Sequence, residues 1–204
     1  DVVNRDPVSE ASQQELILYL ESAVLQYDAL MVADYENGVV DEPVLKMLLP
    51  LARSHSKFVA ADSHGRLHRF HGIDALTPNQ PEAEAELGRS LQEPADLLEG
   101  GAELLQQLGC GNLLVTLGAM GMALFDDQGG GELIPVRSVA GVADTTGAGD
   151  TVAAVFTLSF LSGATAREAA ELANLAGAAV VTKLGAATTS SDELLSLLGD
   201  SASN

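Results

Sequence analysis

The 204-residue sequence contains no tryptophan, one cysteine and few basic residues. With a single cysteine, Cys110, the chain cannot form an internal disulfide, which favours a reducing compartment such as the cytoplasm. Ten Lys and Arg against 29 Asp and Glu give a net charge of −19, which opposes binding to nucleic acid or to an anionic membrane surface. No apolar run approaches the ~18 residues of a membrane-spanning helix, and no signal-peptide pattern opens the chain. We therefore expect a cytoplasmic protein without nucleic-acid or membrane partners.

Two glycine patterns of nucleotide-binding proteins are also missing. The chain has no Gly-x4-Gly-Lys-Ser/Thr, which excludes a P-loop enzyme. A dinucleotide-binding fingerprint should follow the first strand and precede an acidic residue by about 20 positions. Here the glycines of the segment 144–150 come late and end directly in Asp150, so we discount a dinucleotide-binding domain.

The sequence is 47% hydrophobic, only 4% aromatic, and contains 20 glycines. Apolar strand-like segments alternate along it with helical patterns, which predicts a mainly parallel sheet with helices on both faces. No repeat or linker marks a second domain. The predicted strands cover 29–33, 58–61, 73–77, 112–117, 122–125, 132–136 and 138–142.

Capping patterns predict where several helices begin. Ser12, Asn79 and Thr165 each precede a Glu by three residues, as in a capping box. We expect the helix after Thr165 to end near Lys183 with Gly185 as its terminator. A last helix opens at Ser190 and Glu193 and ends at Gly199 in the same way.

The segment 144–150 places two glycines before an apolar run, 151–161, that predicts a buried helix. Gly147 and Gly149 let the backbone approach a ligand closely, and the first N–H groups of a helix lie unpaired at its positive end. Together they predict an anion site with the carboxylate of Asp150 beside it. In one interpretation, the anion is a phosphoryl group in transit and Asp150 deprotonates the attacking hydroxyl. In the other, the segment is a glycine turn, and Asp150 is a first-turn residue that the helix dipole favours.

Polar residues follow three other strands. Asp34 and Asp62 each follow one, at the edge where ligands of open α/β sheets bind, so Asp34 is a candidate substrate contact or a solvated loop residue. Asn79 and Glu82 follow another and are either ligands of hydrated Mg²⁺ or simply helix caps. The basic cluster 64–71 is either a phosphate site or a solvated loop.

The residues Asp-Thr-Thr-Gly-Ala-Gly-Asp-Thr at 144–151 resemble the second signature of the ribokinase-like (PfkB) carbohydrate kinases. Three further stretches resemble motifs of that family in the same order. They are the Asn-x-x-Glu motif at 77–82, the nucleotide-floor turn at 115–121, and the late ATP and cation loops within 174–189. Four motifs in the family's order are far more specific than any one alone.

Within the family, the segments 33–38 and 183–188 look most like the kinases of D-glycero-β-D-manno-heptose 7-phosphate. Those kinases usually carry lysine where this chain has Asn37, and Asp-Pro-Lys-Gly where it has Asp62-Ser63-His64-Gly65. The two lysines on the substrate side are therefore replaced, while the nucleotide-side motifs are kept.

The resemblance implies a role for each matching residue. Asp150 would be the general base, and Gly147, Ala148 and Gly149 would offer N–H groups to the transferred phosphoryl. The residues implied to bind ATP are Asn79, Glu82, Thr116, Gly118, Gly121, Asn174 and Gly177, of which Asn79 and Glu82 would also hold Mg²⁺ through water. The residues implied to hold a monovalent cation, K⁺, mostly through backbone oxygens, are Asp144, Thr146, Val180, Gly185 and Thr189.

The resemblance also implies a three-layer α/β/α ribokinase-like fold, with residues 1–204 as the C-terminal portion of a single carbohydrate-kinase domain. The first third of that fold would lie upstream. The implied activity is ATP-dependent phosphorylation of a hydroxyl on a sugar or sugar phosphate, heptose 7-phosphate above all, and a homodimer is allowed. The alternative is a degenerate or truncated module that binds nucleotide or a partner without catalysis.

Overall fold

The structure, a computed structural model, describes residues 8–127, 130–136 and 141–201. Most of the strand predicted at 138–142 lies outside these residues. None of the described helices is long and apolar enough to cross a bilayer.

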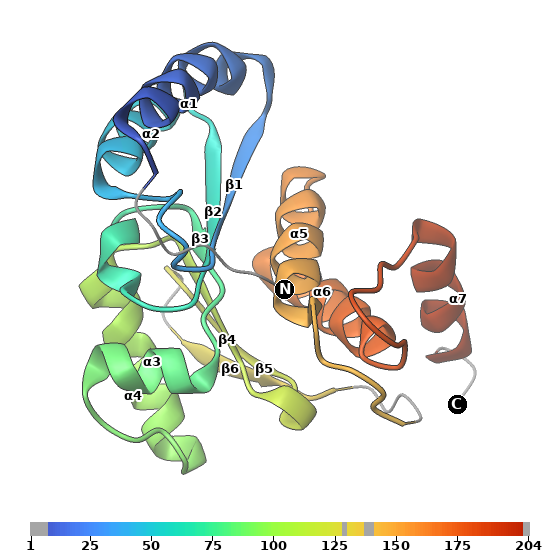
Figure 1. The fold of residues 1–204 in the computed structure, drawn as a ribbon. Coiled ribbons are helices and arrows are strands. Elements are labelled where there is room, and N and C mark those ends of the chain that lie inside the picture. Colours follow the sequence, from blue (N-terminus) through green and yellow to red (C-terminus); the bar gives the residue numbers. More distant parts are fainter. Residues whose placement is uncertain (1–7, 128–129, 137–140, 202–204) are drawn as a thin grey trace.

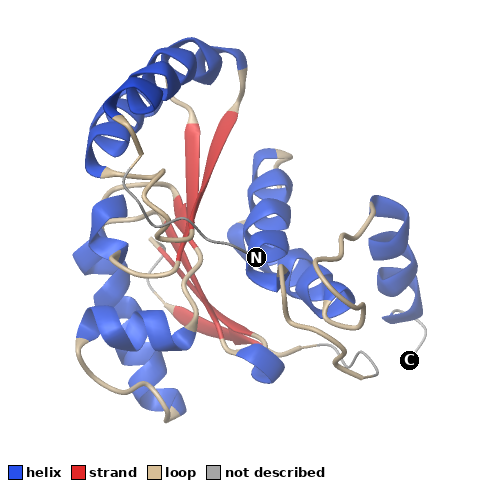
Figure 2. Ribbon diagram, viewed as in Figure 1, coloured by secondary structure: helices blue, strands red, loops and turns tan. Residues whose placement is uncertain are grey.

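Six strands form one sheet in the order in which they occur in the sequence (Figures 1 and 2). The first four strands are parallel, and the last two run antiparallel to their neighbours. The sheet is therefore mixed, because the short turns after β4 and β5 return the chain directly, as only antiparallel neighbours allow. The strands are β1 (Ala29–Asp34), β2 (Phe58–Ser63), β3 (Ala75–Leu76), β4 (Asn112–Thr116), β5 (Met122–Asp126) and β6 (Gly131–Ile134).

Helices cover both faces of the sheet, as predicted (Figure 2). Four helices lie on one face: α1 (Glu10–Ala23), α2 (Glu42–Ser54), α3 (Gln80–Leu87) and α4 (Pro94–Leu108). The other face is covered by α5 (Ala148–Leu161) and α6 (Ala166–Val180), and α7 (Ser191–Ser201) packs on α6. Short 3₁₀ turns span Val24–Gln26, Leu67–Phe70 and Gly118–Met120.

The core divides into two clusters, one on each face of the sheet. Alternate residues of a strand point to opposite faces, so Leu113 and Val115 of β4 join the cluster under α1–α4, while Leu114 joins the cluster under α5 and α6. Cys110 is buried, and burial raises the pKa of its thiol to about 12. The thiol is thus a small apolar packing group.

Several predicted helix ends are wrong by a few residues. Ser9, and not Ser12, caps α1, because its side chain accepts the N–H of Ser12. Helix α6 ends at Val180, before Gly185, because the N–H of Lys183 already closes a tighter turn on the carbonyl of Val180. Helix α7 continues through Gly199 to Ser201.

The capping boxes predicted at Asn79 and Thr165 are both confirmed. Helix α5 begins at Ala148, three residues earlier than the apolar run predicts, because Gly147 adopts a φ of +80° and starts the helix from there. The earlier start matters for the site, since it places Asp150 in the first turn of the helix.

Candidate active site

The carboxyl ends of the four parallel strands bring the predicted polar residues to one edge of the sheet. Asp34 pairs in register with Ser63, so β1 and β2 end side by side. Asn79 forms an isolated parallel bridge with Thr116, and the Thr116 N–H donates to the Pro78 carbonyl at 2.9 Å. The topology thus assembles residues that the sequence separates by more than 80 positions.

Asp150 lies at this edge, in the first turn of α5, and its side chain is half-buried. The hydroxyl of Tyr35, the residue that follows β1, donates to Asp150 Oδ1 at 2.6 Å. Gly147 gives α5 no side-chain cap, so the helix start keeps N–H groups available for an anion. Of the three predicted donors, Ala148 makes a long turn bond of 3.3 Å to the Thr145 carbonyl. The carboxylate and the positive helix end therefore meet as predicted.

A second buried carboxyl, Asp62 of β2, lies directly against this helix start. A Cβ added to Gly149 would come within 3.1 Å of Asp62 Oδ2, so glycine is what lets the helix approach. Burial raises the pKa of Asp62 to about 6, His64 opposes the rise, and the negative charges of Asp150 and Glu82 add to it. The pKa of Asp62, a carboxyl beside the candidate base, therefore lies close to neutral pH.

Asp34 is buried, and its carboxylate is held from within the protein. Arg69 Nη1 donates to Asp34 Oδ2 at 2.9 Å, and the N–H of Glu36 donates to Oδ1 at 3.0 Å. Arg69 also donates to the Val40 carbonyl at 2.7 Å, so the pair ties the loop after β1 to the turn after β2. This is a positioning role, and the predicted contact of Asp34 with a substrate stays a prediction.

Asn79 and Glu82 use most of their polar atoms to cap α3. The Asn79 side chain accepts the N–H of Glu82 at 2.9 Å, and Glu82 Oε2 accepts the N–H of Asn79 at 2.7 Å. Glu82 Oε1 lies 3.1 Å from His64 Nδ1. Both carboxylate oxygens of Glu82 are therefore engaged within the protein, and the predicted contact of these two residues with Mg²⁺ stays a prediction.

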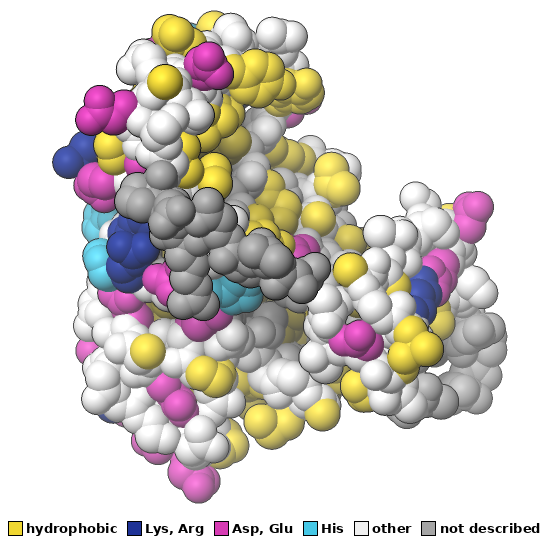
Figure 3. All heavy atoms as spheres, viewed as in Figure 1, with side chains coloured by type: hydrophobic (Ala, Val, Ile, Leu, Met, Phe, Trp, Pro, Cys, Tyr) yellow, Lys and Arg dark blue, Asp and Glu magenta, His cyan; other side chains and the backbone are white. Residues whose placement is uncertain are grey.

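The basic cluster at 64–71 is matched by acidic side chains. His64 pairs with Glu82, His68 with Glu86 at 3.0 Å, and Arg66 with Glu36 at 3.3 Å. A hollow of about 470 Å³ lies between this loop and α3. On the face drawn in Figure 3, the few Lys and Arg side chains likewise have acidic neighbours. The basic side chains of this cluster are thus paired with acidic ones, and the cluster does not form a strongly positive patch.

The predicted nucleotide residues flank β4 and β5. Gly118 and Gly121 both have positive φ, and a side chain on Gly121 would meet the Ile134 carbonyl at 2.1 Å. Asn174 is buried and donates to the carbonyls of Ile134 and Pro135 at 3.2 and 2.9 Å. Gly177 faces α5, where a Cβ would come within 2.9 Å of Val152. Gly121, Asn174 and Gly177 therefore have close contacts within the protein, and the contacts of all four residues with ATP stay predictions.

Three of the five predicted cation ligands lie together. Asp144 accepts the N–H and the hydroxyl of Thr146 at 2.9 and 2.7 Å and the N–H of Gly185 at 3.1 Å. These bonds, the Thr146 hydroxyl foremost, hold the pKa of Asp144 below its usual range, so it stays charged. The carbonyl of Val180 accepts the N–H of Lys183, and Thr189 donates to Glu193 at 2.9 Å. The described residues contain no group of three or more His, Cys, Asp or Glu arranged to hold a metal ion.

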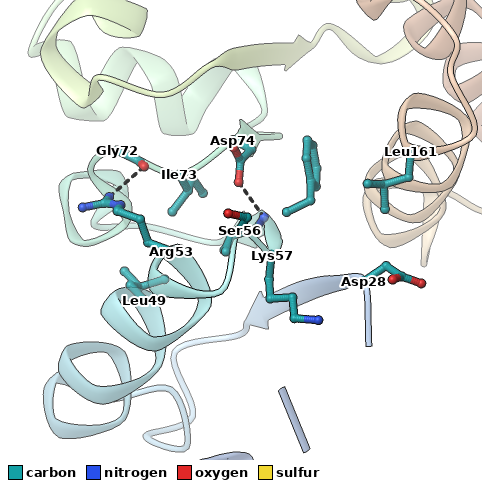
Figure 4. Close-up of a pocket in the computed structure, with 11 residues that line it drawn as sticks. Asp28, Leu49, Arg53, Ser56, Lys57, Gly72, Ile73, Asp74 and Leu161 are labelled. Carbon is teal, nitrogen blue, oxygen red and sulfur yellow. Dashed lines mark hydrogen bonds between the residues drawn. The ribbon is translucent and has the colours of Figure 1, made fainter. Parts of the chain in front are cut away.

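A separate cavity of about 360 Å³ lies at the opposite, amino ends of β1 and β2 (Figure 4). Two of its charged groups have partners in the protein, since Arg53 donates to the Gly72 carbonyl at 2.8 Å and Asp74 accepts the N–H of Val59 at 2.7 Å. It shares no lining residue with the edge that holds Asp150, so it is no part of the candidate site.

Sequence reasoning missed Tyr35 as a site residue and Arg69 as the partner of Asp34. It noted Asp62 as a residue that follows a predicted strand, and it placed His64 in the basic cluster and at the position where the family pattern carries lysine. Asp62 did carry a signal, because it lies near the carboxyl end of β2, as Asp34 ends β1. No local sequence signal pointed to the contact of Tyr35 with Asp150, because the two residues are 115 positions apart.

Comparisons with known proteins show the family of this chain. The pfkB family of carbohydrate kinases matches residues 1–193. The chain is 36% identical to the Bifunctional protein HldE of Trichlorobacter lovleyi over 197 residues, and 34% identical to that of Desulfatibacillum aliphaticivorans over 202 residues. These matches cover 96% and 98% of this chain but only 40% and 41% of the relatives, so the chain spans about two-fifths of their length.

Solved structures show the same fold. Phosphofructokinase-2 from Escherichia coli in complex with potassium superimposes with a TM-score of 0.81 and 23% identity, over 96% of this chain and 64% of that one. The ribokinase of Arabidopsis thaliana, complexed with ribose and ATP, gives 0.76 and 23%, over 94% and 60%. The fold is therefore ribokinase-like, and the chain belongs to the pfkB family of carbohydrate kinases.

Proposed function

We propose that this chain is part of an ATP-dependent kinase that phosphorylates a hydroxyl of a sugar or sugar phosphate. The chain supplies the catalytic base and the residues that bind the nucleotide. The observation that carries the proposal is the half-buried carboxylate of Asp150 in the first turn of α5, at the sheet edge that also holds Asn79 and Thr116. Among acceptors, a heptose 7-phosphate-like sugar has the most support, because the segments 33–38 and 183–188 resemble the kinases of that sugar.

In the proposed reaction, Asp150 accepts the proton of the acceptor hydroxyl while that oxygen bonds to the γ-phosphorus of ATP. The bond from phosphorus to the β,γ-bridging oxygen breaks, and ADP leaves. The N–H groups of Gly147, Ala148 and Gly149, at the start of α5, would stabilise the charge that develops on the transferred group. Phosphoryl transfer passes through a loose transition state, so positioning and charge neutralisation matter more than a strong base.

Cations would assist this chemistry. Mg²⁺, when bound, would neutralise charge on the phosphate oxygens, with Asn79 and Glu82 holding its waters, since their own oxygens already cap α3. Asp144, kept charged by Thr146 and Gly185, would be the anionic ligand for K⁺. We further propose that residues 1–204 form one carbohydrate-kinase domain of a cytoplasmic protein, with a homodimer as its simplest assembly.

Asp150→Asn tests the base. General-base catalysis contributes about 10²–10⁴-fold, so we expect kcat to fall by about that factor while ATP binding persists. ADP release is measured against a panel of free and phosphorylated sugars, and binding with a fluorescent ATP analogue. Asp192→Asn is the matched control, because Asp192 also lies in the first turn of a helix, α7.

The test uses this chain and, where its gene encodes a longer protein, that protein as well. Full activity in Asp150→Asn would overturn the assignment of the base. If neither wild-type protein phosphorylates any sugar but both bind the ATP analogue, the non-catalytic module is the correct alternative.

A further inference from the structure

Tyr35 links the candidate base to the rest of the site. It follows β1 directly, and its hydroxyl donates to Asp150 Oδ1 at 2.6 Å. Its ring packs against His64, with centroids 5.3 Å apart and planes at 31°. Tyr35 thus spans from the end of the sheet to the start of α5.

The contact continues to the nucleotide side. His64 Nδ1 lies 3.1 Å from Glu82 Oε1, and the other oxygen of Glu82 accepts the N–H of Asn79. One continuous chain of contacts therefore runs from Asp150 through Tyr35 and His64 to Glu82. It joins the two sets of residues that the proposed reaction needs on either side of the transferred phosphoryl.

Burial does not explain the placement of Tyr35, because 52% of its surface is exposed. An exposed ring gains little from the hydrophobic effect, so its directed contacts with Asp150 and His64 are what hold it. Within the described part of the chain, Tyr35 is the only side chain that hydrogen-bonds to Asp150. A donor on one carboxylate oxygen restricts rotation of the carboxylate and leaves the second oxygen to accept a proton.

We propose that Tyr35 is a positioning residue for phosphoryl transfer, which holds Oδ1 of Asp150 so that Oδ2 faces the acceptor hydroxyl, with His64 fixing the ring. The inference rests on the proposed function, because it assigns a partner to the same base. It goes beyond that function by giving a role to Tyr35, which lies in the segment 33–38 but to which the resemblance assigns none.

The hydrogen bond to Asp150, then burial, raise the pKa of Tyr35 to about 12. The phenol therefore remains a donor at every pH at which the protein would work. The other titratable groups that face this contact are Asp62 of β2, His64 of the following loop and Glu82 of α3.

Tyr35→Phe removes the hydroxyl and keeps the ring against His64. We expect kcat to fall about tenfold, because the base loses its fixed orientation, while KM for ATP stays unchanged. Tyr27→Phe is the matched control, since Tyr27 is likewise an exposed tyrosine, 61% accessible, in a connection between elements. The control should keep the wild-type kcat and KM.

A second measurement needs no turnover. NMR titration of isotope-labelled tyrosine, with the Tyr35 signal assigned by its loss in Tyr35→Phe, reports the pKa of that phenol. Asp150→Ala should move the Tyr35 titration down toward its ordinary value of 10.0. If the two side chains are not hydrogen-bonded in solution, removal of the Asp150 carboxylate will leave the Tyr35 titration unchanged.

The outcomes separate the two proposals. If the wild-type protein phosphorylates a sugar and Tyr35→Phe matches its kcat, the inference about Tyr35 is overturned and the proposed function stands. An unchanged Tyr35 titration in Asp150→Ala also overturns the inference. If no acceptor is phosphorylated by the wild-type protein, the proposed function fails first.

Discussion

Three aspartates at one sheet edge show how surroundings set the chemistry of a single residue. Asp34 is buried and paired with Arg69. Asp62 is buried without an arginine partner, and its pKa rises to about 6. Asp150 is half-buried and accepts one hydrogen bond from Tyr35. The carboxylate of Asp34 holds two loops together, burial disfavours the charged form of Asp62, and Asp150 is the candidate base.

We predict that Asp62→Asn stabilises the protein at neutral pH. The pKa of Asp62 rises from 3.8 unfolded to about 6 folded, so the folded state binds more protons in between, and stability falls as pH rises through that window. The amide cannot ionise, so the variant should be about 1–3 kcal/mol more stable at pH ~7.5 and no more stable than wild type below pH ~4.

Urea denaturation at both pH values measures this difference. Asp192→Asn, in the first turn of α7, serves as the control for removing one negative charge. A loss of stability in Asp62→Asn that is equal at the two pH values would contradict the prediction, because it would indicate a lost contact and not a buried charge.

At the scale of elements, glycine sets how closely the helices approach the sheet. Helix α4 crosses β5 at Gly101, where a Cβ would lie 2.0 Å from Phe125 Cζ. Phe125 is fully buried and cannot move aside easily. The turn preceding α5 uses glycine differently, since the φ of +80° at Gly147 starts the helix at the position that brings Asp150 to the site.

Gly101→Ala should destabilise the protein by about 1–3 kcal/mol through overpacking against Phe125. Gly199→Ala is the matched change, because Gly199 also lies inside a helix but a Cβ there meets nothing within 4 Å. It should stabilise the protein by about 0.5–1 kcal/mol from helix propensity alone. Thermal unfolding of both variants compares them, and equal effects would refute the packing argument.

At the scale of the whole molecule, charge is the dominant feature. The net charge of −19 repels itself across a chain of 204 residues. Most described ion pairs are exposed, and exposed pairs contribute little to stability. The buried pair of Arg69 and Asp34, whose side chains are 8% and 1% exposed, is screened far less by salt.

We therefore expect salt to stabilise the protein. Raising choline chloride from ~20 to ~500 mM should increase Tm by about 2–6 °C, because it screens repulsion among carboxylates. Potassium chloride at equal ionic strength separates screening from a specific cation site at Asp144, since only specific binding adds a further rise. A Tm that falls with choline chloride would contradict the dominance of self-repulsion.

The sequence by itself determined the fold class, the element order and the candidate base. Local patterns carry these features, because the capping boxes at Asn79 and Thr165 and the glycines before Asp150 depend only on neighbouring residues. These patterns mispredicted helix ends where two local signals compete. Ser9 caps α1 although Ser12 also begins a capping pattern, and α7 continues through Gly199 although glycine commonly ends a helix.

Only the tertiary structure decided what surrounds the base. Tyr35 reaches Asp150 across 115 residues, Arg69 neutralises Asp34 across 35, and Asp62 meets the helix start at Gly149. None of these contacts has a local sequence signal, because each depends on the parallel register of β1 and β2 and on the packing of α5 against them. A linear pattern records which groups are present, whereas their distances and burial, which set charge and reactivity, arise only when the sheet brings its strand ends together.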